Sequence, residues 1–197
     1  MSIGLYFGSF NPVHVGHLII ANHLYSNGYV KEVWFIVSPQ NPFKTQGLLN
    51  QNHRLHLLRV ALEGEVKLKA SNIEFNLPKP SYTINTLTYL KEKYPTKEFT
   101  IIMGSDGFQN IAKWKNYEII IKNYKILIYK RPGFEVTETL GADITIADAP
   151  LLEISSTHIR NMIRQRKSFR FLVPDSVKEE IEKNNFYGPS SENPAQQ

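Results

Sequence analysis

Short apolar runs alternate with segments of helical spacing along this chain, and the runs end at glycine or proline. The runs at residues 3–7, 33–37, 99–103 and 126–129 are followed by Gly8, Pro39, Gly104 and Arg131-Pro132-Gly133. Continuous apolar runs are typical of strands buried on both faces of a parallel sheet. The alternation therefore predicts an α/β fold: a Rossmann-like single domain whose parallel sheet has helices on both faces. In such sheets ligands bind beyond the carboxyl ends of the strands.

The segments between these runs supply the expected helices and loops. Helices are predicted over 15–25, after Gln51, from Thr83 as N-cap to Tyr94, in short turns within 108–123, and from near Ser156 and near Pro174. Residues 66–75 predict a strand broken near Ser71-Asn72, and residues 144–146 a short strand. The polar segment 39–51 predicts a functional loop. We expect one domain over 1–187 and a disordered tail over 188–197, which is rich in Pro, Ser, Asn and Gln.

Composition narrows the classes of partner. The chain has 197 residues, 42% of them hydrophobic, which suffices for one core. Its net charge of +5 suits an anionic partner, but the basic residues are spread out, which favours a solvated surface over a nucleic-acid site. The absence of cysteine excludes disulfides, thiolate zinc sites and thiol nucleophiles. With no leader pattern and no segment of membrane-spanning length, we expect a cytoplasmic protein without nucleic-acid or membrane partners.

The strongest chemical signal is the segment Gly8-Ser9-Phe10-Asn11-Pro12-Val13-His14-Val15-Gly16-His17, between the first strand and the first helix. Gly8 permits a tight turn and a close approach of backbone to ligand. His14 and His17 share one face of the helix start, and Gly16 leaves room for a ligand between them. The helix N-terminus adds free N–H donors and partial positive charge. We interpret the segment as a phosphate site rather than as two structural histidines. A zinc site is the other possibility, but the nearby sequence offers no third ligand.

The second signal is the segment Ile154-Ser155-Ser156-Thr157-His158-Ile159-Arg160. Its consecutive hydroxyls before a helix are good caps, and they also offer donors to an anion. Arg160 lies one turn further on the side of Ser156 and Thr157, where its planar fork could clamp polyphosphate. Alone, the segment fits a capped helix with a surface arginine. Beside the first segment, the polyphosphate interpretation is favoured.

Both segments carry a family resemblance. The first resembles the GxFxPxHxGH signature of the nucleotidyltransferase α/β-phosphodiesterase superfamily, and the second is similar to its ISSTxIR signature. Up to about Tyr187 the chain most closely resembles the bacterial nicotinate-nucleotide adenylyltransferases. The resemblance implies adenylyl transfer from ATP to nicotinate mononucleotide, giving nicotinate adenine dinucleotide and pyrophosphate in NAD biosynthesis. It further implies Mg²⁺ bound through the ATP phosphates, no metal site on the protein itself, and a possible oligomer.

The resemblance assigns site residues to both substrates. The implied catalytic residues are His14, His17, Lys44 and Arg160. The implied ATP-binding residues are Gly8, Ser9, Phe10, His14, Gly16, His17, Gly104, Asp106, Ser156, Thr157 and Arg160. The implied mononucleotide-binding residues are Thr83 in the family's SYT turn, Trp114 stacked on the pyridine ring, Lys115 through its N–H at the carboxylate, and Arg131 in the RPG turn. Taken singly, Trp114 fits a core side chain better, while Thr83 could be only a helix cap, Asp106 a turn residue and Arg131 a surface charge. The joint order of these motifs favours the site.

The chain departs from the family pattern at three places. Phe7-Gly8 stands where the family often has two glycines. Asn41-Pro42-Phe43-Lys44 stands where Pro-Pro-His-Lys is frequent, so Lys44 is the one cation carried over. Lys115 replaces an aromatic residue, which is harmless if only its N–H is used.

Two further functions remain open from the sequence. Adenylyl transfer to nicotinamide mononucleotide or phosphopantetheine would use the same signatures, although phosphopantetheine enzymes tend to be shorter and lack a segment like that of Trp114. A non-catalytic nucleotide-binding or nucleic-acid-binding module would keep the fold without turnover. The basic charge is its only support, and the intact residues His14, His17 and Arg160 argue against it.

Overall fold

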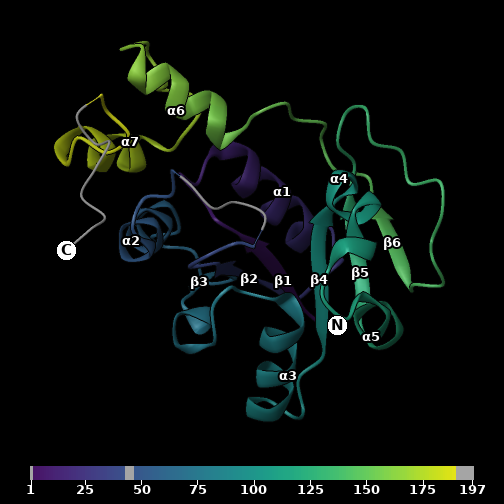
Figure 1. Cartoon of the computed structure of the whole chain (residues 1–197). Coiled ribbons are helices and arrows are strands. Elements are labelled where there is room, and N and C mark those ends of the chain that lie inside the picture. The colour runs from purple at the N-terminus through teal and green to yellow at the C-terminus, as the bar shows by residue number, and fades with distance from the viewer. Residues whose placement is uncertain (1, 43–46, 190–197) are drawn as a thin grey trace.

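The computed structural model describes residues 2–42 and 47–189, and its centre is one parallel sheet of six strands (Figure 1). The strands lie in the order β3-β2-β1-β4-β5-β6, with β3 and β6 at the two edges. Their bounds are β1 Ile3–Gly8, β2 Glu32–Val37, β3 Leu68–Ser71, β4 Phe99–Gly104, β5 Lys125–Tyr129 and β6 Ile144–Ala147. The predicted α/β fold with a parallel sheet is confirmed. Lys44 and residues 190–197 of the predicted tail lie outside the described residues.

Alternating side chains divide the core into two layers, one on each face of the sheet. In β2, Val33, Phe35 and Val37 enter the first layer, whereas Trp34 and Ile36 enter the second. Because both faces of the central strands β1, β2, β4 and β5 are buried, these strands read as largely apolar runs. This is why the strands could be located from hydrophobicity alone.

Helices cover both layers, as the alternation predicts. Helices α1 (Val15–Ser26), α2 (Gln51–Ala61), α6 (Ser156–Arg164) and α7 (Asp175–Lys183) pack into the first layer. Helices α3 (Thr83–Lys93), α4 (Ser105–Gln109) and α5 (Tyr117–Asn123) pack into the second. Two 3-10 turns, η1 (Ile73–Asn76) and η2 (Ile111–Lys113), complete the elements. Within the described ranges, no helix is long and apolar enough to cross a membrane.

One local expectation was wrong, and another was right in part. The N-cap of α3 is Tyr82, and Thr83 is instead the first helical residue, so that α3 begins without a side-chain cap. The strand predicted over 66–75 is shorter, but the break predicted near Ser71-Asn72 is confirmed, because β3 ends at Ser71 and the chain then turns into η1. There the buried carboxylate of Glu74 accepts a hydrogen bond from Thr86 Oγ1 at 2.7 Å. This hydrogen bond holds η1 against α3. If β3 continued as a strand, Glu74 would not lie next to Thr86.

The centre of the sheet contains a topological switch point. β1 pairs with β2 on one side and with β4 on the other. The chain adds β2 and β3 outward in one direction, and then returns to place β4, β5 and β6 in the other direction. Connections therefore diverge at the carboxyl ends of β1 and β4, which leaves a crevice of the kind that binds ligands in open α/β sheets.

Candidate active site

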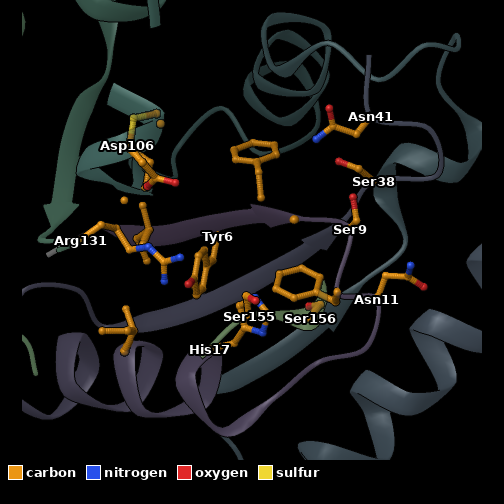
Figure 2. Close-up of a pocket in the computed structure, with 18 of the residues that line it drawn as sticks. Tyr6, Ser9, Asn11, His17, Ser38, Asn41, Asp106, Arg131, Ser155 and Ser156 are labelled. Carbon is orange, nitrogen blue, oxygen red and sulfur yellow. The ribbon is translucent and has the colours of Figure 1, made fainter. Parts of the chain in front are cut away.

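A cavity of about 570 Å³ opens at this crevice. It is bordered by the carboxyl ends of β1 and β4 and by the N-termini of α1, α3, α4 and α6. Figure 2 shows Asp106 and Arg131 toward one end of the pocket and Ser9, Ser38 and Asn41 toward the other. Its volume is in the usual range for small-molecule sites. All site residues implied by the sequence line this cavity, except Lys44, which lies outside the described residues.

The two histidines form a stacked pair at the start of α1. Their ring centroids are 3.7 Å apart and their planes differ by 25°. His14 is the N-cap of α1, and its backbone N–H donates a hydrogen bond to His17 Nδ1 at 3.3 Å. Because Nδ1 accepts, the neutral ring of His17 carries its proton on Nε2. His17 lies at the wall of the cavity.

His14 is the deeper of the two rings. It is 5% exposed, and its Nδ1 finds no hydrogen-bond partner among the described residues. Burial, with the positive charge of Arg131 as the second cause, lowers the pKa of His14 to about 4. His14 is therefore neutral at pH 7.

The role predicted for Gly16 needs correction. Stacked rings 3.7 Å apart are in van der Waals contact, so no ligand fits between the histidines. A Cβ atom at Gly16 would lie 3.0 Å from His14 Nδ1 and 3.6 Å from Ile154 Cβ. Gly16 therefore provides space for the His14 ring and for the segment before α6, while its backbone lines the cavity.

Phe10 anchors the loop between β1 and α1. Its backbone has a left-handed φ of 46°, and its ring is 2% exposed. The ring packs edge-on against Tyr6 and His17, with centroid distances of 5.9 Å and 5.0 Å. A Cβ atom at Gly8 would lie 2.8 Å from Phe10 Cζ, so this ring position requires glycine there. Phe10 thus supports the histidine pair by packing.

The start of α6 forms a second wall of the cavity, next to the loop after β1 to which it is bonded. Ser155 is the N-cap, and its Oγ accepts a hydrogen bond from the His158 N–H at 3.2 Å. Ser156 Oγ donates to the Pro12 carbonyl at 2.9 Å, which joins α6 to the loop after β1. Arg160 Nη1 donates to the Asn11 carbonyl at 2.8 Å, and its Nη2 donates to Thr157 Oγ1 at 3.2 Å. The two sequence signatures, far apart along the chain, are therefore bonded to each other directly.

Asp106 and Arg131 lie at the end of β4. Asp106 is in the first turn of α4, and a Cβ atom at Gly104 would collide with Asp106 Oδ1. The Arg131 backbone N–H donates to Ser105 Oγ at 2.9 Å. The Arg131 guanidinium is close enough to lower the pKa of His14. Arg131 lines the same cavity as the histidine pair and Trp114, and its assignment to the mononucleotide stays a prediction.

The remaining wall combines the first turn of α3 with the segment after η2. Thr83 lies in the uncapped first turn of α3, where free N–H groups favour an anion. Trp114 is half-buried and follows η2 directly. Lys115 Nζ lies 4.7 Å from the centre of the Tyr82 ring. The three residues implied for the mononucleotide ring therefore line one cavity together.

Sequence reasoning missed several lining residues. Tyr6 OH donates to Tyr129 OH at 3.1 Å, and burial raises the pKa of both phenols. Both tyrosines sit within apolar strand runs, where an aromatic side chain looks like core. Ser38 follows β2 directly, so its place at a carboxyl strand end was a usable signal. Asn11 belongs to the first signature, but the sequence alone assigns it no role.

The charge of the cavity is strongly asymmetric. Asp106 is the one carboxylate along its described lining. Cationic side chains on the same lining are Lys113, Lys115, Lys130, Arg131 and Arg160. Such a wall is complementary to polyanionic ligands.

Fold, cavity and signatures define a class of protein. The sequence model of the cytidylyltransferase-like family matches residues 5–162, from β1 into α6. The chain is therefore a nucleotidyltransferase of the cytidylyltransferase-like family.

Relatives place it within that class. A relative in Flavobacterium johnsoniae is 48% identical over 191 residues, covering 95% of this chain and 99% of its own length. One in Bacteroides fragilis is 44% identical and covers 90% of each chain. Both carry the name "Probable nicotinate-nucleotide adenylyltransferase", and the chain belongs to the family of nicotinate-nucleotide adenylyltransferases.

Solved structures agree on the fold. Nicotinic acid mononucleotide adenylyltransferase of Plasmodium falciparum, in complex with NaAD, matches with a TM-score of 0.83 at 21% identity, covering 94% of this chain and 97% of that chain. The same enzyme in complex with APC matches with a TM-score of 0.80 at 20% identity, covering 94% and 96%.

Proposed function

We propose that this chain transfers the adenylyl group of ATP to nicotinate mononucleotide, forming nicotinate adenine dinucleotide and pyrophosphate. The observation that carries the proposal is a single cavity shared by His17, Arg160 and the Thr83–Trp114 wall. The cavity therefore has a phosphate end and a separate aromatic wall with an uncapped helix start. Family membership supports the same reaction, and the cytoplasmic location expected from the sequence belongs to the proposal.

In this reaction the 5′-phosphate of the mononucleotide attacks the α-phosphorus of ATP, and the bond from that phosphorus to pyrophosphate breaks. The attacking phosphate is already an anion at neutral pH, so no general base is needed. The site must hold two anions in line and stabilise the charge that develops on the α-phosphoryl and leaving groups. The enzyme thus acts chiefly by positioning and by hydrogen-bond donation.

Each phosphate then has a proposed partner. His17 donates from Nε2 to the α-phosphate, supported by the stacked neutral ring of His14. Arg160 and the first-turn N–H groups of α6 hold the β- and γ-phosphates. Thr83 and Lys115 donate backbone N–H groups to the nicotinate carboxylate, and Trp114 stacks on the pyridine ring. Lys44 retains a proposed role beside the phosphates.

Magnesium enters this proposal with ATP. The described lining offers hydroxyl, imidazole and amide groups but one carboxylate, Asp106. Such a lining suits a Mg²⁺ ion that is held mainly by phosphate oxygens and water. When bound, the ion offsets charge on the transferred and leaving phosphates.

The decisive experiment measures pyrophosphate release from Mg-ATP with a panel of acceptors. The panel contains nicotinate mononucleotide, nicotinamide mononucleotide and phosphopantetheine, with a no-acceptor control. Release that depends on nicotinate mononucleotide supports the proposal. Release with phosphopantetheine alone would reassign the acceptor, and the absence of release with every acceptor in the panel would indicate a non-catalytic module.

A further inference from the structure

A buried arginine lies behind the phosphate end of the cavity. Arg54, on α2, is 1% exposed and heads the largest fully buried side chains. Burial lowers its pKa only to about 10, so the guanidinium is charged at pH 7. Burying a charge is costly unless hydrogen bonds satisfy it. Its retention in this core therefore requires a compensating role.

Arg54 is satisfied by backbone carbonyls. Its Nε donates to the Leu49 carbonyl at 2.7 Å. Its Nη1 donates to the carbonyls of Ser9 at 2.6 Å and Ser38 at 2.9 Å. Its Nη2 donates to the Pro39 carbonyl at 3.0 Å. One planar group thus ties together the chain after β1, the chain after β2 and the residues before α2.

Two of these four carbonyls belong to residues that line the cavity. Ser9 and Ser38 both line it, and each is 7% exposed. The guanidinium on the Ser9 carbonyl also polarises the Ser9–Phe10 peptide, which strengthens the Phe10 N–H as a donor.

Asn11 extends the network to Arg160. Asn11 Nδ2 donates to the Gly47 carbonyl at 2.9 Å, and Asn11 Oδ1 accepts from the Leu49 N–H at 3.1 Å. The Asn11 carbonyl accepts from Arg160 Nη1 at 2.8 Å. Both arginines therefore bind the segment Ser9–Asn11: Arg54 through the Ser9 carbonyl and Arg160 through the Asn11 carbonyl.

We propose that Arg54 is a positioning residue for adenylyl transfer: it fixes the Ser9–Asn11 loop and the end of β2 in the arrangement that receives the ATP phosphates. This inference rests on the proposed function, because it takes the cavity as the ATP site. Lysine cannot replace the guanidinium fully. The three N–H donors of a lysine all lie on one nitrogen atom. The four carbonyls here accept from three separate nitrogens of a planar guanidinium, which one ammonium group cannot reach together.

The test compares Arg54→Lys and Arg54→Met with Arg59→Met. Arg59 is exposed on the same helix, one turn and a half further along, so it controls for loss of a cation from α2. Melting temperature, kcat, KM for ATP and KM for nicotinate mononucleotide are measured separately, well below the lowest melting point. We expect Arg59→Met to match the wild type. Arg54→Lys should lose on the order of 10²-fold in kcat/KM for ATP, the typical cost of a misplaced phosphate site, with a smaller change in the acceptor KM.

Other outcomes overturn the inference. Arg54 variants with a lowered melting temperature but wild-type kcat and KM would show a structural role only. If neither variant folds, NMR of the unmodified enzyme decides: the Arg54 Nε–H resonance should shift on binding a non-hydrolysable ATP analogue while that of Arg59 stays, and an unmoved Arg54 resonance refutes the inference. A wild-type enzyme without pyrophosphate release would refute the proposed function instead.

Discussion

The two stacked histidines have different environments, and this difference assigns their roles. His14 is buried and neutral at pH 7, whereas His17 is half-buried with its proton on Nε2. A hydrogen-bond donor on the cavity wall can stabilise the negative charge that develops on a phosphoryl group during the reaction. A buried neutral ring can support that donor without adding a second cation.

His17→Ala should therefore abolish useful turnover and leave the fold intact. Loss of one preorganised donor typically costs about 10²–10³ in rate. Steady-state kinetics measure the loss, and a melting curve checks the fold. Activity within a few-fold of the wild type would remove His17 from the proposed chemistry.

His14 should make stability depend on pH. The unfolded chain protonates this imidazole below its ordinary pKa of 6.5, but the folded protein only below about 4. Between these values the unfolded state binds more protons, so stability is full above pH 6.5 and falls as the pH drops toward 4. The fully developed effect is roughly 3 kcal/mol. Denaturant unfolding of the wild type and of His14→Gln across this range measures it, and equal pH slopes would contradict the buried neutral state.

Arg160→Ala should weaken the use of ATP much more than the use of the acceptor. The guanidinium already points a planar fork at the loop after β1, where the β- and γ-phosphates are proposed to lie. Arg160→Lys should recover activity only in part, since lysine cannot form the bidentate contact. The KM values of both substrates are to be compared. An effect confined to the mononucleotide would mean that the two ends of the site are reversed.

Among the secondary-structure elements, the start of α3 is the one that we expect to select the acceptor. Its first-turn N–H groups have no side-chain cap, and Lys115 follows the half-buried Trp114 across the cavity. Both oxygens of a carboxylate can accept hydrogen bonds from these N–H groups. The NH₂ group of a neutral amide is itself a donor, so it cannot accept a hydrogen bond from them. An unmatched buried donor costs roughly 1–3 kcal/mol.

We therefore predict a preference for nicotinate over nicotinamide mononucleotide of at least about tenfold in kcat/KM. Both acceptors present the same ring to Trp114, so Trp114→Ala should impair both and leave their ratio nearly unchanged. The ratio is measured with saturating Mg-ATP. Equal use of the two acceptors would show that the Thr83–Trp114 wall is misassigned, even if adenylyl transfer stands.

The elements could be predicted wherever one local signal decides the outcome. The runs that became β1, β2, β4 and β5 were found because a strand buried on both faces must be apolar throughout. The shift of the α3 cap from Thr83 to Tyr82 could not be predicted, since a tyrosine has no capping side chain to announce it. The break after β3 could be placed near Ser71-Asn72, but the turn that follows, η1, could not be predicted, because it depends on the contact of Glu74 with Thr86 on α3. The role of Arg54 could not be predicted for the same reason, because its four carbonyl partners come together only in the folded chain.

At the scale of the whole molecule, the cavity is lined by segments that lie far apart along the chain, from the loop after β1 to the start of α6. Ligand that binds only the folded state stabilises it, by about 2.7 kcal/mol at a hundredfold excess over Kd. For a protein of this size that corresponds to a rise in melting temperature of roughly 5–10 °C. Mg-ATP should produce this rise, and adenosine at the same concentration should produce less, because it lacks the phosphates that Arg160 is proposed to hold. An unchanged melting temperature with Mg-ATP would contradict the assignment.

The two layers of the core separate the two recognition tasks. Helices α1 and α6 begin at the part of the cavity where the phosphates are proposed to lie, and both pack into one layer. Helix α3 and the Trp114 segment pack into the other layer. Mutations that reshape the acceptor wall therefore disturb a different set of packed side chains from those that support the histidines. A lineage can drift toward a new acceptor, or an engineer can install one, by altering one face of the sheet while the adenylyl-transfer machinery on the opposite face is inherited unchanged.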